Sequence, residues 1–511
     1  MASTVLKKQE WARDDKPQPD YEVVVIGGGF SGIGAGIKLK KAGIHSFAIL
    51  ERGEDLGGVW HFNTYPGIAV DISSFTYSFS FEQNPNWSRM FAPGKELKAY
   101  ANHCVDKYDL NRNFKFNTSV TKTEFDEDHH VWIIYLSDGS TIVTRYIFSC
   151  SGPLSQPKSP DIKGLSEFTG KVMHPARWDH DYEIKNQKVA IIGTGATSVQ
   201  LVPTIAPEVE RLDVYQRTPI WILPKPDRPI SKKEKFAFKY IPGAQSAVRM
   251  ITNIISELAL VSGIIYNKQF PQIIRTIEKI CLKHLNKQIE APEIRKKMTP
   301  GYGFGCKRPS LSNKYYPAFN RLNVDLITDG IDRITENGIV TADGTFREID
   351  CLITATGYRT MEKGNLPTYE VYGVGGLELG SFWEECRYQA YEGITVPKFP
   401  NYFIISFGPR SVTGASWFSI IEAHTTHAIR CVKEANRRHA TSIEIRQQSH
   451  DQYQKKVLKR EKNNVMFNND CAGSNSYYYD NNGDAAYLRP SSGLEMWWHS
   501  RHFPLRNYQF E

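Results

Sequence analysis

Apolar, β-branched runs alternate with glycine turns and helical stretches along most of this 511-residue chain. Residues 21–26 read Tyr-Glu-Val-Val-Val-Ile, a continuous run typical of a buried parallel strand. A glycine-rich turn follows, and then helical spacing to about Ala42, with Gly43 in the position that often ends a helix. Residues 46–51 predict a second strand that ends in Glu51. This order predicts a β-α-β nucleotide-binding unit.

The same pattern occurs a second time further along the chain. It predicts a strand over residues 188–192, a glycine turn over 193–198, a helix, and a strand over 211–216. Two further predicted strands, within residues 146–152 and 351–357, end in glycine, and we expect them where the chain crosses between domains. The sequence therefore predicts an α/β fold with two Rossmann-like dinucleotide-binding domains.

A segment of different character separates the two halves of the second unit. Over residues 226–300 strand patterns are absent, and lysines and arginines recur at helical spacing, which predicts a helical insertion. One interpretation is a lid over the substrate site, and the alternative is contact with a membrane surface. The most apolar window, residues 250–266, contains Ser256 and Glu257, so we expect a buried or interfacial helix, not a spanning one.

The length of the chain exceeds that of a single hydrophobic core, so at least two domains are expected. The predicted division is a first domain from residues 1–152 and 358–511, a second from 153–225 and 301–357, and the insertion over 226–300.

Composition narrows the function classes. Hydrophobic residues make up 41% and charged residues 23%, as in ordinary globular proteins, and no signal peptide is evident at the N-terminus. The net charge of +8 is spread without a block of like charges, so we expect no nucleic acid partner. The eight cysteines show no C-x-x-C pair and no metal-ligand spacing, which argues against a disulfide reductase or a metal site. We expect reduced thiols and a cytoplasmic location.

The first glycine turn predicts an FAD site. Gly27 permits the tight turn, Gly29 lets the backbone approach a pyrophosphate, and Gly32 lets the helix pack on the strand. Glu51 can accept hydrogen bonds from ribose hydroxyls and would repel a 2′-phosphate, which favours FAD over NADPH. The alternative is a glycine turn that binds no nucleotide. The other predicted FAD contacts are Phe30, Ser31, Arg52, Gly58, Val59, Trp60 and Asp71.

The second turn predicts an NADPH site. Gly193 and Gly195 repeat the first two glycines, and Ser198 stands in place of the third. The following strand ends at Arg217 and not at an acid, and an arginine there can pair with a 2′-phosphate. An ordinary surface arginine is the alternative. The other predicted cofactor contacts in this half are Ala196, Thr197, Thr218, Lys307 and Gly357.

A third motif joins the two turns. Phe168, Gly170, His174, Trp178 and Asp179 form the pattern F-x-G-x-x-x-H-x-x-x-W-[P/D]. With this motif between two dinucleotide turns, the chain resembles the type I Baeyer–Villiger monooxygenases, a family of class B flavoprotein monooxygenases. The resemblance implies that NADPH reduces FAD, that O2 adds to it as a C4a-peroxyflavin, and that oxygen is inserted beside a ketone carbonyl, with some sulfide oxidation.

The resemblance also implies roles for individual residues. Arg308 is the expected catalytic cation, Asp71 the carboxylate that orients it, and Lys307 a ligand of the NADPH phosphate beside Arg217 and Thr218. Without the resemblance, Lys307 and Arg308 would be a charged pair on a loop, and Asp71 a helix cap.

The role of the motif histidine stays open between two interpretations. His174 is expected to link the two domains by hydrogen bonds rather than to transfer protons.

Rival functions and departures remain. An N- or S-oxygenating flavin monooxygenase is the nearest rival, but that sister family carries Tyr or Phe where this chain has Trp178. An NADPH-dependent electron-transfer flavoprotein is another.

The segment 475–480 departs from the family's S-W-Y type, so the identity of the ketone cannot be carried over. The aromatic tail, Tyr487, Trp497, Trp498 and Phe503, predicts either an apolar substrate wall or core packing.

Overall fold

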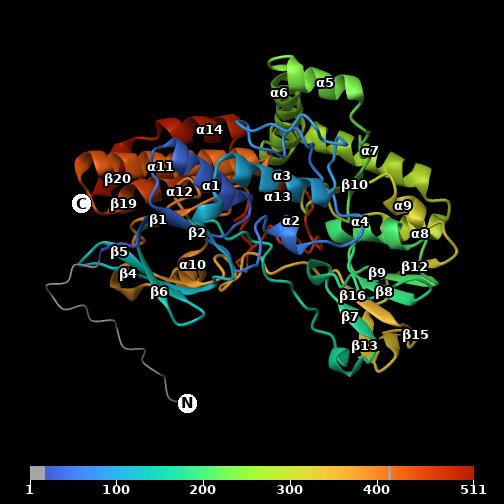
Figure 1. Ribbon diagram of the computed structural model, residues 1–511. Coiled ribbons are helices and arrows are strands. Elements are labelled where there is room, and N and C mark those ends of the chain that lie inside the picture. The colour runs from blue at the N-terminus through green and yellow to red at the C-terminus, as the bar shows by residue number, and fades with distance from the viewer. Residues whose placement is uncertain (1–17, 413–415, 481) are drawn as a thin grey trace.

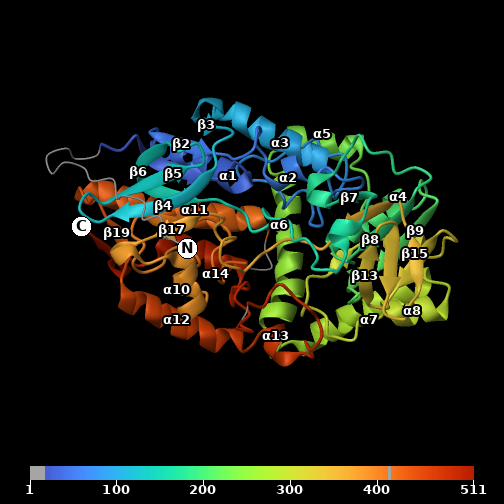
Figure 2. The same ribbon diagram turned by 90° about the horizontal axis from the view of Figure 1, so that it is seen from below.

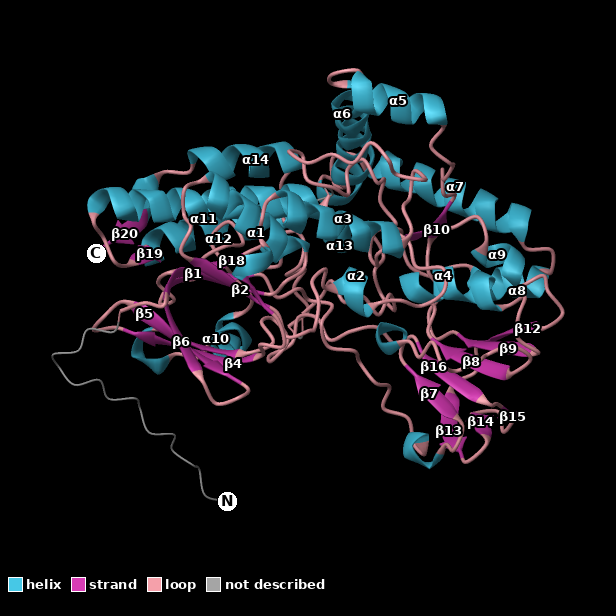
Figure 3. Cartoon of the chain, in the orientation of Figure 1, coloured by secondary structure: helices cyan, strands magenta, loops and turns pink. Residues whose placement is uncertain are grey.

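The computed structural model describes residues 18–412, 416–480 and 482–511. Its strands form two groups that stand apart, with helices covering both (Figures 1 and 3). Figure 2 shows the same separation from below. Each group contains one of the two predicted glycine turns, so the repeated sequence pattern corresponds to two structural units.

The first sheet belongs to the predicted FAD domain. Its strand order is β17-β4-β5-β6-β1-β2-β3, and β18 also pairs with β6. The strands are β1 (Tyr21–Ile26), β2 (Phe47–Leu50), β3 (Phe114–Lys115), β4 (Val120–Asp126), β5 (Val131–Leu136), β6 (Thr141–Ser149), β17 (Glu370–Tyr372) and β18 (Tyr402–Ile404). β1 pairs in parallel with β2 and β6 and is almost entirely buried, as its apolar run predicted.

Helices from both ends of the chain cover this sheet. They are α1 (Phe30–Lys41), α2 (Val59–Phe62), α3 (Gly94–Lys107), α10 (Leu379–Cys386), α11 (Trp417–Arg438), α12 (Gln447–Glu461), α13 (Val465–Asn468) and α14 (Gly493–His502). α1 and α11 share the largest core cluster, so the C-terminal part of the chain completes the domain that the N-terminal part begins. A short antiparallel pair, β19 (Ile443–Ile445) and β20 (Tyr508–Phe510), closes it.

The second sheet has the order β12-β9-β8-β16-β7 and is wholly parallel. Its strands are β7 (Lys171–Met173), β8 (Lys188–Ile192), β9 (Arg211–Tyr215), β12 (Val324–Ile327) and β16 (Cys351–Thr354). Around it lie α4 (Ala196–Ile205), α9 (Tyr315–Ala318), the pair β10 (Ile222–Leu223) and β11 (Ser310–Leu311), and a small sheet of β13 (Ile331–Thr335), β14 (Gly338–Thr341) and β15 (Phe346–Glu348).

Between the two halves of this domain lies a wholly helical segment. Its helices are α5 (Lys232–Tyr240), α6 (Ala244–Ser256), the π-helical continuation η4 (Glu257–Ile265), α7 (Pro271–Gln288) and α8 (Pro292–Met298). In the part of the chain that the structure describes, Ala244–Ile265 is the one helix long and apolar enough to cross a membrane by length and composition, and 22% of its most apolar window is buried. The expectation of a buried helix was therefore wrong, and the interfacial alternative stays open.

The cysteines differ from expectation at one point. Cys306 and Cys471, which are 165 residues apart in sequence, form a disulfide, although we expected reduced thiols throughout. The spacing of the cysteines along the sequence does not predict this pair, because the second domain and the C-terminal segment come together only in the folded chain. The bond ties the loop before Lys307 to residues 470–480.

Candidate active site

The two glycine turns have the same backbone conformation. Gly27 has φ 113° and Gly193 has φ 111°, values that strongly favour glycine. The residues that precede the two helices also agree, with φ −75° and ψ −171° at Gly29 and φ −73° and ψ −172° at Gly195. The chain therefore builds the same phosphate-binding turn twice.

The first turn fits a pyrophosphate. A Cβ on Gly32 would lie 1.9 Å from the carbonyl oxygen of Gly27, so the helix can approach the strand only with glycine there. No side chain caps the N-terminus of α1, which leaves its N–H groups available to phosphate oxygens. Phe30 and Ser31 form the buried first turn of that helix. Gly58 approaches Gly29 across the turn, since a Cβ on Gly58 would lie 3.0 Å from the Gly29 Cα.

Glu51 lies at the end of β2, where a ribose is expected. It is 4% exposed and accepts hydrogen bonds from the backbone N–H of Gly28 at 2.7 Å and of Gly53 at 2.8 Å. These two contacts fix the carboxylate, and a carboxylate has further lone pairs for hydroxyl donors. The neighbouring Arg52 donates to the carbonyl of Ser155 at 2.7 Å, so it braces the entry to the second domain.

The second turn fits a second pyrophosphate. A Cβ on Gly195 would meet no atom within 4 Å, so its backbone faces open space, and no side chain caps α4, which begins at Ala196 and Thr197. Ser198, which replaces the third glycine, donates a hydrogen bond to the carbonyl of Gly193 at 2.7 Å. The serine thus fastens helix to turn at the position where glycine gives close packing in the first unit.

Two cations gather beyond this second turn. Burial, together with the nearby charge of Arg217, lowers the pKa of Lys307. Neither side chain forms a salt bridge within residues 18–412, 416–480 and 482–511. Thr218 lies beside them and its hydroxyl accepts from the Asn475 amide at 2.9 Å. Two close cations without a carboxylate suit the 2′-phosphate of NADPH.

The predicted catalytic pair is formed in the structure. Arg308 Nη2 lies 2.7 Å from Asp71 Oδ2, and Nε lies 3.3 Å from the same oxygen, although 237 residues separate the two in sequence. Asp71 raises the pKa of Arg308 well above its ordinary value, so the guanidinium is permanently charged. The side chain of Arg308 remains 33% accessible, so its other donors can reach a bound molecule.

Aromatic residues surround this pair. Burial raises the pKa of Tyr478, and the charge of Arg308 opposes that effect, as it does for Tyr477. Tyr77 is close to both charges and accepts a hydrogen bond from Trp60 Nε1 at 3.2 Å. The segment 475–480, which departs from the family pattern, therefore lies beside the pair, whereas Tyr77 was not predicted and no sequence signal indicates it.

The motif between the turns is structural in this fold. Phe168 is buried in the core of the second domain, and a Cβ on Gly170 would lie 2.5 Å from both the Phe168 ring and the carbonyl oxygen of Asp350. Trp178 packs against the second-domain core, and Asp179 pairs with Lys171. None of the four touches the Arg308 pair in the contacts described.

Both ring nitrogens of His174 contact polar groups of the backbone. Its Nδ1 accepts from the N–H of Ala176 at 3.1 Å, and its Nε2 lies 3.0 Å from the carbonyl oxygen of Gly357. Burial lowers the pKa of His174, which favours the neutral ring that this pattern needs. The histidine thus fastens the end of β16 to the linker.

The two domains face each other across a cleft of about 940 Å³. Trp60, Asn63 and Tyr65 line it from the first domain, and Gln200 and Thr204 from the second. In the wall of the cleft, the Gln200 side chain donates to the Ala69 carbonyl at 2.9 Å and accepts from the Tyr65 hydroxyl at 3.0 Å. One α4 side chain therefore positions the loop that leads to Asp71.

A chain with two such turns, one suited to FAD and the other to NADPH, is a two-dinucleotide flavoprotein oxidoreductase. Residues 24–232 match the family described as pyridine nucleotide-disulphide oxidoreductase. Over 444 residues the chain is 40% identical to a Baeyer-Villiger monooxygenase of Pseudomonas aeruginosa, covering 86% of this chain and 82% of that protein. It is 35% identical to one of Streptomyces coelicolor, over 98% of this chain and 94% of that one.

Solved structures agree. The structure of OTEMO in complex with FAD and NADP matches this chain with a TM-score of 0.86 and 25% identity. The match covers 97% of this chain and 100% of that one. Cyclohexanone monooxygenase from Rhodococcus sp. Phi1 bound to NADP+ matches with a TM-score of 0.85 at the same identity of 25%, covering 97% and 100%. The chain therefore belongs to the Baeyer–Villiger monooxygenase family. It is an FAD-containing, NADPH-dependent monooxygenase, and the predicted two-domain α/β fold is confirmed.

Proposed function

We propose that this protein inserts one oxygen atom of O2 beside the carbonyl of a small apolar ketone, forming an ester or lactone, and that it oxidises some sulfides as a side activity. The single observation that carries the proposal is the Arg308–Asp71 pair, joined at 2.7 Å. When bound, FAD reduced by NADPH supplies the electrons that activate oxygen. The route through a C4a-peroxyflavin stays a prediction, as does the cytoplasmic location.

Arg308 is proposed to hold the negative charge that develops on the ketone oxygen. Attack at a carbonyl turns its oxygen into an oxyanion, and fixed donors aimed at that oxygen lower the barrier. A guanidinium suits this task because it stays charged at any working pH and presents several donors in one plane. Asp71 occupies two of those donors and thereby fixes the direction of the rest.

The aromatic surroundings support an apolar substrate. Tyr477, Tyr478 and Tyr487 lie together, with ring centroids 4.9 to 5.9 Å apart, and the charge of Arg308 acts on all three hydroxyls. Flat rings beside a single cation offer an apolar wall and one polar anchor, which is what a ketone needs.

The test is Arg308→Ala, assayed for ester formation from cyclic, linear and aryl ketones. We expect product formation to fall by at least about 100-fold, the effect of removing one oxyanion donor. Anaerobic reduction of bound FAD by NADPH should persist, because both glycine turns and the Arg217–Lys307 pair are unchanged in this variant. Arg333→Ala, which removes an arginine from an exposed pair with Asp332, is the matched control. Ester formation at the normal rate in Arg308→Ala would contradict the proposed role.

A further inference from the structure

The helical insertion carries an unusual exposed surface. On α6 and its continuation, Met250, Ile251, Ile254, Ile255 and Leu258 are between 50% and 65% exposed. Their spacing of one, three and four residues puts them on one face of the helix. The neighbouring helix α5 and its C-terminal turn add three more exposed apolar side chains, Phe236, Tyr240 and Ile241.

This face contains no charge. Residues 244–265 include only two ionisable side chains, Arg249 and Glu257, and both turn toward the protein. Arg249 is 7% exposed and donates to the backbone carbonyls of Phe75 and Ser78 at 2.9 and 2.8 Å. A helix exposed only to water would bear charged residues on its outer face, so this face is suited to apolar surroundings.

The last helix repeats the arrangement. On α14, Leu494, Trp497 and Trp498 are 72%, 46% and 55% exposed. The aromatic tail was expected to form a substrate wall or core, but these two tryptophans do neither.

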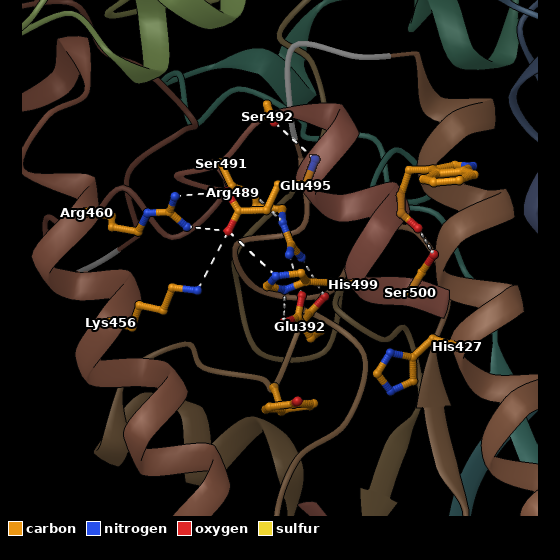
Figure 4. Close-up of polar contacts among 12 residues, drawn as sticks. Glu392, His427, Lys456, Arg460, Arg489, Ser491, Ser492, Glu495, His499 and Ser500 are labelled. Carbon is orange, nitrogen blue, oxygen red and sulfur yellow. Dashed lines mark hydrogen bonds and ion pairs between the residues drawn. The ribbon is translucent and has the colours of Figure 1, made fainter. Parts of the chain in front are cut away.

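Two polar residues of α14, Glu495 and His499, instead face the protein. Figure 4 shows Glu495 and His499 pointing from α14 toward Arg460 and Glu392. Arg460 Nη2 lies 2.9 Å from Glu495 Oε2, and His499 Nδ1 lies 3.0 Å from Glu392 Oε1. These polar contacts fix one side of α14 and leave Leu494, Trp497 and Trp498 exposed.

The two apolar faces adjoin. Glu257 Oε1 accepts a hydrogen bond from the N–H of Gly493 at 2.8 Å, which joins the middle of the long helix to the start of α14. Exposed Leu258 and Leu494 are the next residues along each helix. In Figure 1 the α5–α6 pair and α14 both lie along the upper side of the molecule.

Basic residues border this surface at both ends. Lys232, Lys233 and Lys239 are exposed on α5. At the other end, Arg501 of α14 lies near Lys38, where its charge contributes to lowering the lysine pKa, after the larger effect of burial. Lys38 also lines a surface cleft of about 650 Å³ whose walls include the basic residues Lys41, Arg430 and Lys433, together with Arg437, which is paired with Glu434. An apolar centre can contact the acyl chains of a bilayer, and a basic rim can contact its anionic headgroups.

We propose that this surface binds the enzyme peripherally to anionic phospholipid membranes. The exposed isoleucines, leucines and tryptophans enter the headgroup–acyl boundary, and the lysines contact lipid phosphates. The helix lies on the membrane and does not cross it, because its opposite side packs on the protein through Arg249, Val261 and Ile265. A second copy of the chain would place the two basic rims near each other, so charge favours lipid over self-association. The lid interpretation does not explain the exposed face.

The test uses the FAD-loaded enzyme and two kinds of vesicle, one of phosphatidylcholine alone and one with equal parts of phosphatidylglycerol. In a flotation assay we expect binding to the mixed vesicles that weakens as salt is raised. The triple variant Ile251→Gln, Ile255→Gln and Leu258→Gln should lower vesicle binding by at least about 10-fold. Lys232→Gln with Lys233→Gln should reduce the preference for phosphatidylglycerol.

The matched control is Leu322→Gln with Phe346→Gln, which changes exposed apolar residues of the second domain at 106% and 49% exposure. It should float like the unaltered enzyme. FAD content and anaerobic reduction by NADPH show that every variant is folded, and vesicle binding is read without any ketone assay. Absence of flotation with both vesicles overturns the proposal. So does a dimer, measured by light scattering, that the triple variant dissociates while no protein floats.

Discussion

At the scale of single residues, the site depends on pairs that the chain brings together from distant segments. Asp71 and Arg308 share no local motif, yet their side chains meet at 2.7 Å and fix a cation in one direction. Lys307, the residue before Arg308, lies close to Arg217 instead, where we expect the NADPH site. We therefore expect two adjacent basic residues to serve two different tasks, one toward the substrate and the other toward NADPH.

The lowered pKa of Lys307 predicts a pH dependence for NADPH use. A lysine with a depressed pKa is fully charged at low pH and loses its proton at a lower pH than an ordinary lysine. The loss of this cation weakens the contact with the 2′-phosphate, so the KM for NADPH should rise on the alkaline side. In Lys307→Arg, steady-state kinetics across pH should show a flatter KM, because guanidinium stays charged.

NADH provides the control for this prediction, because it lacks the 2′-phosphate. Its KM should not follow the Lys307 titration in either form of the enzyme. An equal alkaline rise for NADH and NADPH would show that another group titrates.

At the scale of elements, the disulfide joins two segments of the active site. Cys306 immediately precedes the Lys307–Arg308 pair, and Cys471 begins the segment that leads to Tyr477 and Tyr478. Because the bond fastens one segment to the other, the tyrosines and the arginine keep their relation even though each lies on a loop. Loops with few regular hydrogen bonds need such a constraint to hold a geometry.

Cys471→Ser should therefore lower thermal stability. In the chain-entropy model, opening a loop of 165 residues lowers the free energy of unfolding by at most roughly 5 kcal/mol. We expect a lower Tm, which the fluorescence of released flavin measures during heating. Ester formation should also fall, but by a smaller proportion. Cys386→Ser, which alters an exposed free cysteine, is the matched control. Equal Tm values for both variants would show that the disulfide does not stabilise the fold.

At the scale of the whole molecule, contacts at the crossing between the domains add to the Arg308–Asp71 pair and the Cys306–Cys471 disulfide. The Gln200 side chain binds the loop before Asp71, and His174 binds the end of β16 through the carbonyl of Gly357. Lys158 N–H donates to the same carbonyl at 2.9 Å, where the two crossing segments run side by side. This junction lies at the ends of the second domain, where the chain crosses to the first.

His174→Ala should slow the reduction of FAD by NADPH by about 10-fold, the equivalent of one hydrogen bond of about 1.4 kcal/mol. The FAD content should stay unchanged, because His174 does not touch the first turn. Stopped-flow absorbance under anaerobic conditions measures the rate. His45→Ala, at an exposed position, serves as control. An unaltered reduction rate in His174→Ala would contradict the linking role.

Much of the fold was predictable because its signals are local. The run Val23–Ile26 can be buried only in a central strand, and the first and third glycines of the turn meet backbone atoms that exclude a Cβ. The burial of the helix over residues 244–265 was harder to predict. Its composition permits a buried core helix or an exposed one, and only the neighbours that pack on Arg249 decide between them. The disulfide was missed for the same reason.

The sequence by itself determined both dinucleotide turns and the buried strands that flank them, because backbone conformation and strand burial depend on residues close in the chain. Only the tertiary structure decided that Asp71 faces Arg308, that Cys306 meets Cys471, and which sides of α6 and α14 remain exposed. Those outcomes depend on contacts between segments more than a hundred residues apart, and no short-range pattern encodes such contacts.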